Sequence, residues 1–258
     1  MLEDEVIWIT GASSGIGEAL ALELGKQKTR LALSARSGDK LEQLVQRVRA
    51  LGQAQAHAFP LDVLDRVGNR SCVAQIRECF GSEVSIFVPC AGTYKTSDSL
   101  HRYSSDEHIQ LMQLNFFSLL YGIEAVLPAM LERKHGQIVG VSSLVGYFGL
   151  PRAFGYSASK GAIINALQSL RFELRNSGVQ VKCVNPGFVK TPLTDKNDFE
   201  MPFLVTAEFA ARKMIEALHK ERFETHFPLS LSLVFKFLRI LPQPLFEWII
   251  KKVVYRGR

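Results

Sequence analysis

Tyr156 and Lys160 are the residues whose types and spacing point most directly to proton chemistry. They lie four positions apart in Tyr156-Ser157-Ala158-Ser159-Lys160, so a helix would place both side chains on one face. A free phenol has a pKa of about 10, and a cation beside it favours the phenolate. Ser143 lies upstream, and its hydroxyl can donate to a carbonyl oxygen while Tyr156 transfers a proton. Each residue alone also fits a packing or capping role, but their combination favours general acid/base catalysis.

A glycine-rich segment near the N-terminus has the composition of a phosphate-binding loop. It runs from Thr10 to Gly17, between a β-branched run and an amphipathic stretch, with glycines at positions 11, 15 and 17. Glycines permit a tight turn and close approach of the backbone to a pyrophosphate, whose charge a helix N-terminus stabilises. The residues expected to bind cofactor here are Gly11, Ser13, Ser14, Gly15, Ile16 and Gly17. An ordinary strand-to-helix loop is the alternative, and the strand–loop–helix context favours the cofactor interpretation.

Arg36 and Ser37 lie about 20 residues beyond that loop, at the end of the expected second strand. A carboxylate at this position would bind the ribose hydroxyl of NAD, whereas an arginine pairs with the 2′-phosphate of NADP. No acidic residue occurs until Asp39, and a guanidinium matches phosphate in geometry and charge. We therefore predict NADP(H) as the cofactor. The alternative is that Arg36 belongs to a solvated turn.

Short β-branched runs alternate with longer amphipathic stretches along most of the chain. Because parallel strands need crossover helices, this order predicts an α/β fold with a doubly wound parallel sheet of the Rossmann type. We expect one domain over residues 1–225, followed by a short apolar and basic helical extension over residues 226–258. Strands are expected near residues 6–9, 31–34, 54–61, 85–88, 136–141 and 179–184, and helices near 15–27, 41–51, 73–80, 105–132, 156–176 and 207–218.

These motifs, in this order, resemble the short-chain dehydrogenase/reductase family over about residues 4–222. The loop at 10–17 is similar to that family's cofactor loop, and Ser143, Tyr156 and Lys160 fall on its serine and its Tyr-x-x-x-Lys pair. The other positions that the resemblance assigns are Asn115 as the catalytic asparagine, Asp62 and Val63 beside the adenine, Cys90, Ala91 and Gly92 along the cofactor, and Pro186, Gly187, Val189 and Thr191 at the nicotinamide. One departure is Pro89-Cys90, where the family has two asparagines; proline cannot donate a main-chain hydrogen bond, so we expect a local change in how the sheet is joined.

The resemblance implies hydride transfer between a nicotinamide and a carbonyl carbon. It assigns proton transfer to Tyr156, a lowered Tyr156 pKa and a ribose contact to Lys160, polarisation of the substrate oxygen to Ser143, and a bound water to Asn115. NADP(H) makes carbonyl reduction the expected direction. It also implies a homodimer or homotetramer through the helices near 105–132 and 156–176.

Two apolar segments are expected to form the substrate pocket. One spans residues 188–206, and the other holds Val145, Tyr147, Phe148, Leu150 and Phe154. Their side chains suit a lipophilic carbonyl compound or alcohol. Core or dimer contacts remain an alternative for these aromatic residues.

The composition limits the class of protein. Hydrophobic residues make up 47% of the 258 residues and charged residues 22%, which argues against a disordered chain. The four cysteines form no C-x-x-C pair, which favours a reduced cytoplasmic protein. The acidic start Met1-Leu2-Glu3-Asp4-Glu5 argues against a cleaved secretory signal, and no run of 18 apolar residues predicts a spanning helix. The histidines lack ligand spacing, so we predict no metal site.

The basic charge is concentrated in the C-terminal extension. The whole chain has a formal net charge of +6. Residues 226–258 contain Lys236, Arg239, Lys251, Lys252, Arg256 and Arg258 against Glu247, which leaves residues 1–225 nearly neutral. Two short apolar helices around Pro242-Gln243-Pro244, with Trp248, Tyr255 and basic residues, are typical of an interfacial anchor on the cytoplasmic face of an anionic membrane. Packing of this extension on its own subunit or across a dimer is the alternative.

The leading hypothesis is therefore an NADP(H)-dependent oxidoreductase of lipophilic carbonyl compounds or alcohols. A non-catalytic NADP-binding sensor or scaffold at a membrane surface is the alternative, and the four candidate catalytic residues argue against it. Nucleic-acid binding rests on the isoelectric point alone and is not predicted.

Overall fold

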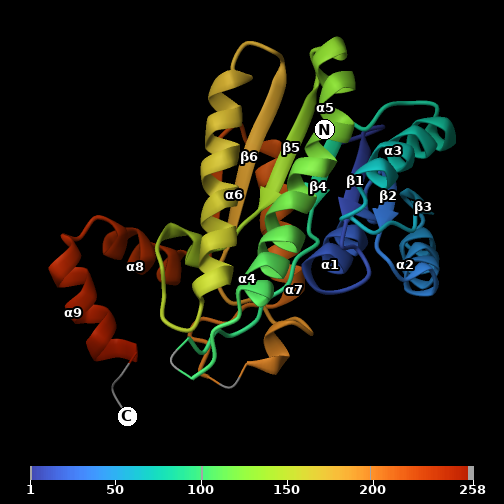
Figure 1. Ribbon diagram of the computed structural model, residues 1–258. Coiled ribbons are helices and arrows are strands. Elements are labelled where there is room, and N and C mark those ends of the chain that lie inside the picture. The colour runs from blue at the N-terminus through green and yellow to red at the C-terminus, as the bar shows by residue number, and fades with distance from the viewer. Residues whose placement is uncertain (1, 100, 198, 255–258) are drawn as a thin grey trace.

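Seven parallel strands form a single sheet in the part of the chain that the computed structural model describes, residues 2–99, 101–197 and 199–254 (Figure 1). The strand order is β3-β2-β1-β4-β5-β6-β7, and every neighbouring pair is parallel. The strands are β1 (Val6–Thr10), β2 (Arg30–Ser34), β3 (Gln55–Ala58), β4 (Ile86–Pro89), β5 (Gly136–Val141), β6 (Val179–Pro186) and β7 (Glu224–Phe227). The order reverses between β1 and β4, as in a doubly wound sheet, so the predicted fold class is confirmed.

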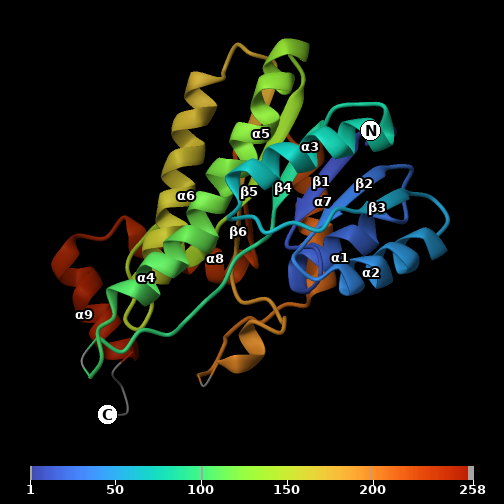
Figure 2. The same ribbon diagram turned by 45° about the vertical axis from the view of Figure 1, so that its right-hand side comes forward.

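Helices cover both faces of the sheet, and strand alternation explains how (Figures 1 and 2). On β1, Ile7 and Ile9 pack into one core with helices α1, α2 and α7, whereas Val6 and Trp8 pack into the other with α3, α5 and α6. The helices are α1 (Gly15–Leu24), α2 (Gly38–Ala50), α3 (Arg66–Phe80), α4 (Ser105–Met112), α5 (Ser118–Arg133), α6 (Phe154–Glu173), α7 (Ala207–His219), α8 (Leu229–Arg239) and α9 (Gln243–Val254). Two 3₁₀ turns, η2 (Leu144–Tyr147) and η3 (Thr194–Lys196), complete the elements between strands.

The expected helix over 105–132 is continuous but irregular. A π-helical turn, η1 (Gln113–Phe117), lies between α4 and α5 and contains Asn115. The stretch Ser105–Arg133 is long and apolar enough by composition to cross a membrane, and an 18-residue window within it has a mean hydropathy of 1.5. Here Leu119, Val126 and Met130 are buried against the sheet, and a core helix passes the same composition test. A third of that window is buried, and this part covers the sheet.

Strand β4, which ends at Pro89, pairs with its two neighbouring strands over different lengths. Strand β4 pairs with β1 over four residues, from Ile86 to Pro89, but with β5 over only Ile86 and Phe87. The Cys90 amide donates to the Thr10 carbonyl at 3.0 Å, so the chain stays attached to β1 after Pro89. The expected local change thus falls between β4 and β5.

The C-terminal segment begins inside the sheet. Strand β7, which the sequence did not predict, pairs with β6 and spans the expected boundary between residues 225 and 226. Helices α8 and α9 follow, as predicted, and separate at Pro242. Residue 198 of the expected pocket segment and residues 255–258 of the extension, including Tyr255, lie outside the described residues.

Candidate active site

The candidate site lies where several strands end at the same edge of the sheet. Strand β1 ends at Thr10, before the glycine loop; β5 ends at Val141, two residues before Ser143; and β6 ends at Pro186. Helix α6 carries Tyr156 and Lys160 and packs closely against the turn after Ser143. A methyl group on Gly146 in that turn would lie 2.8 Å from the Lys160 carbonyl carbon. This close packing brings Tyr156 and Lys160 to the same edge. The carboxyl edge of a doubly wound sheet is where such folds bind ligands.

Ser143 lies close enough to the Tyr156 phenol to affect its pKa. Ser143 is buried, and its hydroxyl donates to the Pro186 carbonyl at 3.3 Å. The ring of Tyr94 packs edge-on against the Tyr156 ring, with centroids 5.0 Å apart. Burial raises the pKa of Tyr156 to about 12, and the neighbouring Ser143 hydroxyl opposes part of that rise. Tyr156 is therefore protonated at neutral pH.

Lys160 does not lower the pKa of Tyr156 in this structure, contrary to expectation. Its ammonium donates to the Val141 carbonyl at 3.0 Å and lies 5.8 Å from the centroid of the Tyr156 ring. Burial lowers the pKa of Lys160 itself to about 8. Burial favours the neutral form of both groups, so the phenol keeps its proton and the lysine loses its proton at a lower pH than usual.

Asn115 is buried and held by three hydrogen bonds. Its Oδ1 accepts from the Thr93 amide at 2.7 Å, and its Nδ2 donates to the Thr93 carbonyl at 3.0 Å and to Ser159 Oγ at 2.9 Å. The π-helical turn carries this side chain, and such turns are frequent at functional sites. Asn115 thus joins the loop after β4 to α6, one residue from Lys160.

The glycine loop has the close contacts that its sequence predicted. Gly11 has a φ of +67°, and a methyl group there would lie 2.5 Å from the Ala91 nitrogen. A methyl group on Gly17 would lie 2.5 Å from the Gly11 carbonyl oxygen. Ser14 precedes α1 without capping it through its side chain, so the first-turn amides remain free to bind an anion.

A small cleft of about 110 Å³ brings ten of the predicted cofactor and catalytic residues together. It is lined by Ile16, Cys90, Gly92, Ser143, Tyr156, Lys160, Pro186, Gly187, Val189 and Thr191, together with Thr93, Val141, Ser142, Leu193 and Thr194. Gly92 leaves room beside Asn115, since a methyl group would lie 3.1 Å from Asn115 Oδ1. The cleft, the uncapped N-terminus of α1 and the closely packed glycines of the loop together fit a dinucleotide cofactor.

Arg36 and Ser37 lie at the other end of the candidate cofactor site, between β2 and α2. Arg36 is exposed, and no hydrogen bond or ion pair involves it within the described residues. Ser37 precedes α2 without a side-chain cap. Asp62 accepts a hydrogen bond from the Leu64 amide at 3.0 Å, and Val63 is buried. A free guanidinium next to an uncapped helix N-terminus is a suitable place for a phosphate.

A second pocket, of about 1090 Å³, meets the cleft at Ser143, Tyr156 and Gly187. The predicted wall residues Val145, Phe148, Leu150, Phe154, Phe188 and Phe199 line it. Tyr147 does not, because its hydroxyl donates to Glu224 beneath the pocket. Met201, Phe203 and Leu204 of the predicted segment are not part of the lining either, and Phe203 and Leu204 are exposed.

Several site residues were missed from the sequence. Tyr94 packs on Tyr156, and Leu231 and Phe235 of α8 line the large pocket. Tyr94 follows the Ala91-Gly92 pair closely, which is a signal that could have placed it. No sequence pattern indicates that α8 returns to the pocket, since this depends on how β7 directs the chain.

Comparison with known proteins agrees with this geometry. The family model described as short chain dehydrogenase matches residues 5–201. The chain belongs to the short-chain dehydrogenase/reductase family. An uncharacterized oxidoreductase of Myxococcus xanthus (strain DK1622) is 35% identical over 239 residues, which cover 93% of each protein. The human protein named dehydrogenase/reductase SDR family member 7 is 35% identical over 200 residues, 76% of this chain and 58% of that protein.

Solved structures share the fold of this short-chain dehydrogenase. A variant of the actinorhodin polyketide ketoreductase, solved with NADPH, superimposes with a TM-score of 0.76 and 28% identity, covering 84% of this chain and 90% of the ketoreductase. A short-chain dehydrogenase/reductase from Burkholderia phymatum, in complex with NAD, has a TM-score of 0.82 at 22% identity, covers 91% and 92%, and supports the fold. The chain is therefore an oxidoreductase whose family uses a nicotinamide cofactor.

Proposed function

We propose that this oxidoreductase uses NADPH to reduce lipophilic carbonyl compounds. The observation that carries the proposal is the meeting of the two cavities at Ser143 and Tyr156. A carbonyl oxygen in the large pocket can reach both hydroxyls from one side, while the cleft on the other side holds the residues expected around a nicotinamide. A bound nicotinamide would supply the hydride.

The side chains of the site have separate roles in this proposal. Ser143 donates a hydrogen bond to the substrate oxygen and stabilises the negative charge that develops there. Tyr156 gives its proton to that oxygen, for which a pKa of about 12 keeps the phenol protonated at neutral pH. Lys160 would hold the nicotinamide ribose and supplies positive charge beside Tyr156, and Asn115 fixes the loop at Thr93 next to both. Apart from Tyr156 and Ser143, the pocket lining is mainly apolar and aromatic, which favours an apolar substrate body.

Arg36 supports NADPH over NADH. Its exposed guanidinium at the end of β2 is not engaged by another described residue and can pair with a 2′-phosphate. Fluorescence titration should show tighter binding of NADPH than NADH. Arg36→Ala should weaken NADPH binding by about 10- to 100-fold and leave NADH binding nearly unchanged. Arg77→Ala, on the exposed C-terminal part of α3, is the control. Preference for NADH, or unchanged NADPH affinity in Arg36→Ala, would contradict the cofactor proposal.

The reductase activity is tested by NADPH consumption with a panel of carbonyl compounds. We expect turnover of apolar ketones or aldehydes by the wild type. The alternative, a non-catalytic NADP-binding sensor or scaffold, is not favoured, because Asn115, Ser143, Tyr156 and Lys160 come together at one site. The alternative would be revived if the wild-type protein binds NADPH but does not consume it with any carbonyl compound of the panel.

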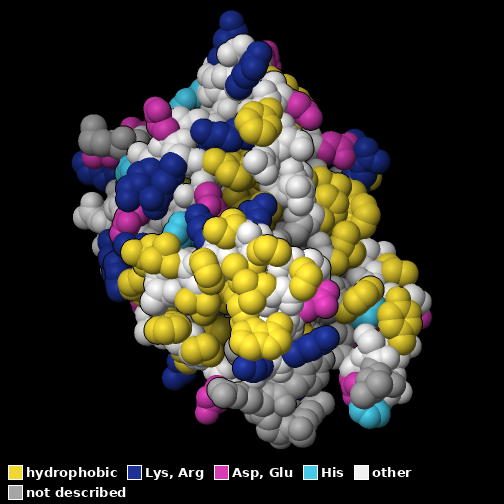
Figure 3. Space-filling model, turned by 90° about the vertical axis from the view of Figure 1, so that its left-hand side faces the viewer, with side chains coloured by type: hydrophobic (Ala, Val, Ile, Leu, Met, Phe, Trp, Pro, Cys, Tyr) yellow, Lys and Arg dark blue, Asp and Glu magenta, His cyan; other side chains and the backbone are white. Residues whose placement is uncertain are grey.

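The outer face of α8 and α9 supports peripheral contact with an anionic membrane. Leu229, Leu233, Phe237 and Ile240 of α8 and its C-terminal end, and Trp248 of α9, are all more than half exposed. Figure 3 shows apolar side chains gathered over this side of the molecule, with lysine and arginine side chains around them. An apolar surface surrounded by basic residues is complementary to an anionic lipid surface.

Phe237→Glu and Ile240→Glu should reduce co-sedimentation with phosphatidylglycerol vesicles without affecting NADPH binding. Val67→Glu, a change of an exposed apolar side chain on α3, is the control. Absence of wild-type binding, or equal binding to neutral phosphatidylcholine vesicles, would contradict the charge argument. A concentration-dependent dimer lost in Phe237→Glu would indicate that this face meets a second copy instead.

A homodimer through α4, α5 and α6 is the proposed assembly. Ile109, Phe117, Leu131, Phe154 and Phe172 of these helices and the turn between them are exposed. Analytical ultracentrifugation should give a dimer or a tetramer, and Phe172→Glu should shift it toward the monomer. A monomeric wild type would contradict the assembly.

A further inference from the structure

Helix α8 forms part of the wall of the large pocket although it lies beyond the last strand of the sheet. Leu231 and Phe235 line the pocket that also contains Ser143 and Tyr156. Leu231 is 6% exposed, whereas Leu233 and Phe237 on the same helix are 56% and 57% exposed. The helix therefore has an inner face directed to the pocket and an outer face directed to solvent.

The aromatic ring of Phe235 has a defined place in that wall. It stacks on Phe148, with ring centroids 5.2 Å apart and an interplanar angle of 19°. Phe148 follows the η2 turn that begins directly after Ser143. Phe246 of α9 packs edge-on against Phe148 at 4.9 Å. A change in the size of residue 235 therefore changes the volume of the pocket along a wall that is connected to the catalytic serine.

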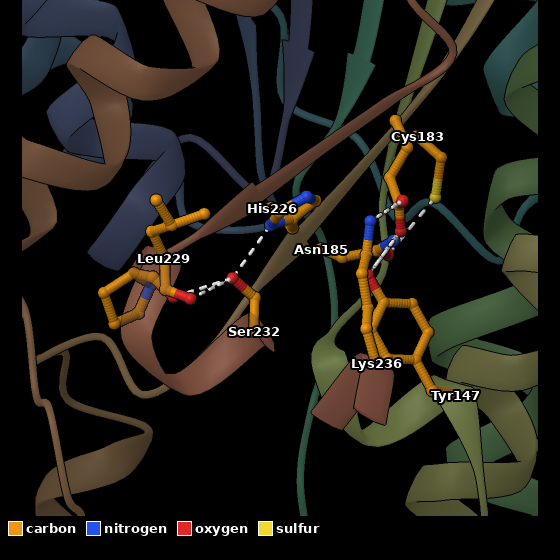
Figure 4. Close-up of polar contacts among 9 residues, drawn as sticks. Tyr147, Cys183, Asn185, His226, Leu229, Ser232 and Lys236 are labelled. Carbon is orange, nitrogen blue, oxygen red and sulfur yellow. Dashed lines mark hydrogen bonds and ion pairs between the residues drawn. The ribbon is translucent and has the colours of Figure 1, made fainter. Parts of the chain in front are cut away.

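The half-buried carboxylate of Glu224 joins α8 to the turn after Ser143 and to the end of β6. Lys236 Nζ donates to Glu224 Oε2 at 2.6 Å, while Glu224 Oε1 accepts from Asn185 Nδ2 at 2.7 Å and from the Tyr147 hydroxyl. Figure 4 shows Lys236, Asn185 and Tyr147 converging from three elements. Tyr147 ends the turn after Ser143, and Asn185 directly precedes Pro186-Gly187. Burial raises the pKa of Glu224, but these hydrogen bonds outweigh that effect and keep it below its usual value.

A second set of contacts holds the start of α8. Ser232 is fully buried, lies 2.8 Å from His226 Nδ1 and donates to the Pro228 carbonyl (Figure 4). Leu231 packs on Gly187, since a methyl group on Gly187 would lie 2.8 Å from Leu231 Cδ2. The inner face of α8 is thus fixed relative to the main chain on which the nicotinamide end of the cleft is built.

We infer that α8 determines substrate size, with Phe235 and Leu231 as the selective side chains and Glu224 as a positioning residue that holds them in place. This inference rests on the proposed reductase function. The substrate class that follows is a carbonyl compound whose apolar body extends from Ser143 and Tyr156 to the stacked rings of Phe148 and Phe235.

Two size changes at Phe235 test the wall directly. The measurement is the ratio of kcat/KM for 2-acetylnaphthalene to kcat/KM for propanal, with NADPH. Phe235→Ala enlarges the wall and should raise the ratio, and Phe235→Trp narrows it and should lower the ratio, each by about tenfold. Phe237→Ala is the matched control on the outer face and should leave the ratio within about twofold of wild type. A ratio unchanged in both Phe235 variants, with NADPH binding intact, would overturn the inference.

The positioning role of Glu224 is tested through its partner. Lys236→Met removes the ion pair but leaves Tyr147 and Asn185 bonded to Glu224. We expect a KM for 2-acetylnaphthalene raised about fivefold or more, with kcat for propanal nearly unchanged. Glu224→Gln should likewise raise the KM for 2-acetylnaphthalene and leave kcat for propanal nearly unchanged. Glu224→Asp keeps the carboxylate and should bring the KM for 2-acetylnaphthalene part of the way back to the wild-type value. A proportional loss with both substrates would indicate a merely structural role and contradict the assignment.

The failure of this inference differs from the failure of the proposed function. Wild-type protein that reduces carbonyl compounds while every α8 variant keeps the wild-type ratio would remove only the inference. Wild-type protein that consumes NADPH with neither substrate nor any other carbonyl compound would remove both.

Discussion

The two cavities that meet at Tyr156 are built in different ways. On the cofactor side, main-chain atoms approach each other closely: a methyl group on Gly11 or Gly17 would lie within 2.5 Å of backbone atoms. On the substrate side, rings from distant segments pack together, as Phe148 does with Phe235 and Phe246. The glycine loop therefore has no room for a methyl group at Gly11 or Gly17, whereas the wall at Phe148 is made by side chains, whose size can change without moving the main chain. The comparison teaches that one molecule can hold a general cofactor rigidly and still vary its substrate.

Tyr156 belongs to both cavities, so its loss should have the largest effect. Tyr156→Phe keeps the ring against Tyr94 but removes the proton donor, and we expect kcat to fall by about 10²- to 10⁴-fold. NADPH affinity by fluorescence should stay within about twofold of wild type, because the ring still fills the space between the cavities. A variant that keeps more than a tenth of the wild-type rate would show that another group supplies the proton.

Gly11→Ala and Gly149→Ala distinguish the two sides by one methyl group each. At Gly11 the methyl group meets Ala91 and Cys90 main-chain atoms at 2.5 to 2.8 Å in a backbone with φ of +67°, and at Gly149 nothing lies within 4 Å. We expect NADPH affinity to fall by more than about tenfold in the first variant, because the loop must move, and to change little in the second. Equal losses in NADPH titrations would refute the idea that the main chain constrains the glycine loop at Gly11 more than the pocket wall at Gly149.

The pH dependence of reduction should report Lys160 and not Tyr156. Lys160 has a pKa lowered to about 8, so its charge is lost as pH rises through 8, whereas Tyr156 stays protonated until about 12. We expect kcat/KM to fall by about tenfold for each pH unit above 8. In Lys160→Arg, whose guanidinium stays charged, the fall should be absent whatever its absolute rate. A wild-type profile flat to pH 10 would contradict the assignment.

The smallest expected effects separate the two faces of α9. Phe246→Ala removes the ring that packs on Phe148, and a loss of about 1 kcal/mol should lower the midpoint of thermal unfolding by about 2–4 °C. Trp248 is 53% exposed, and its ring meets the Lys252 ammonium. Trp248→Ala should therefore lower the midpoint of thermal unfolding by less than about 1 °C. Equal shifts in a calorimetric scan would mean that α9 has no inner side.

The cofactor side of the site could be predicted from the sequence better than the substrate side. The glycine loop and the Tyr156–Lys160 pair depend on residues close together in the chain, and their spacing alone places them on a turn and on one helix face. The prediction that Lys160 lowers the Tyr156 pKa was wrong. Burial raises this pKa, and the position of the Lys160 ammonium, which donates to the Val141 carbonyl, cannot be predicted from the spacing of the two residues. The π-helical turn at Asn115, strand β7 and the return of Leu231 and Phe235 to the pocket depend on tertiary contacts that no local pattern indicates.

The way α8 and α9 are attached has a consequence for the evolution of this fold. Strand β7 completes the main-chain hydrogen bonding of the sheet at Phe227, and within the described residues no main-chain hydrogen bond joins α8 or α9 to it. Side chains such as Lys236 and Phe235 make the attachment, so mutation can remodel these helices while the sheet keeps its register. Exchanging the C-terminal helices would therefore break no main-chain hydrogen bond of the sheet, and grafting them from a relative, together with the side chains that meet Glu224 and Gly187, is a way to change substrate selectivity.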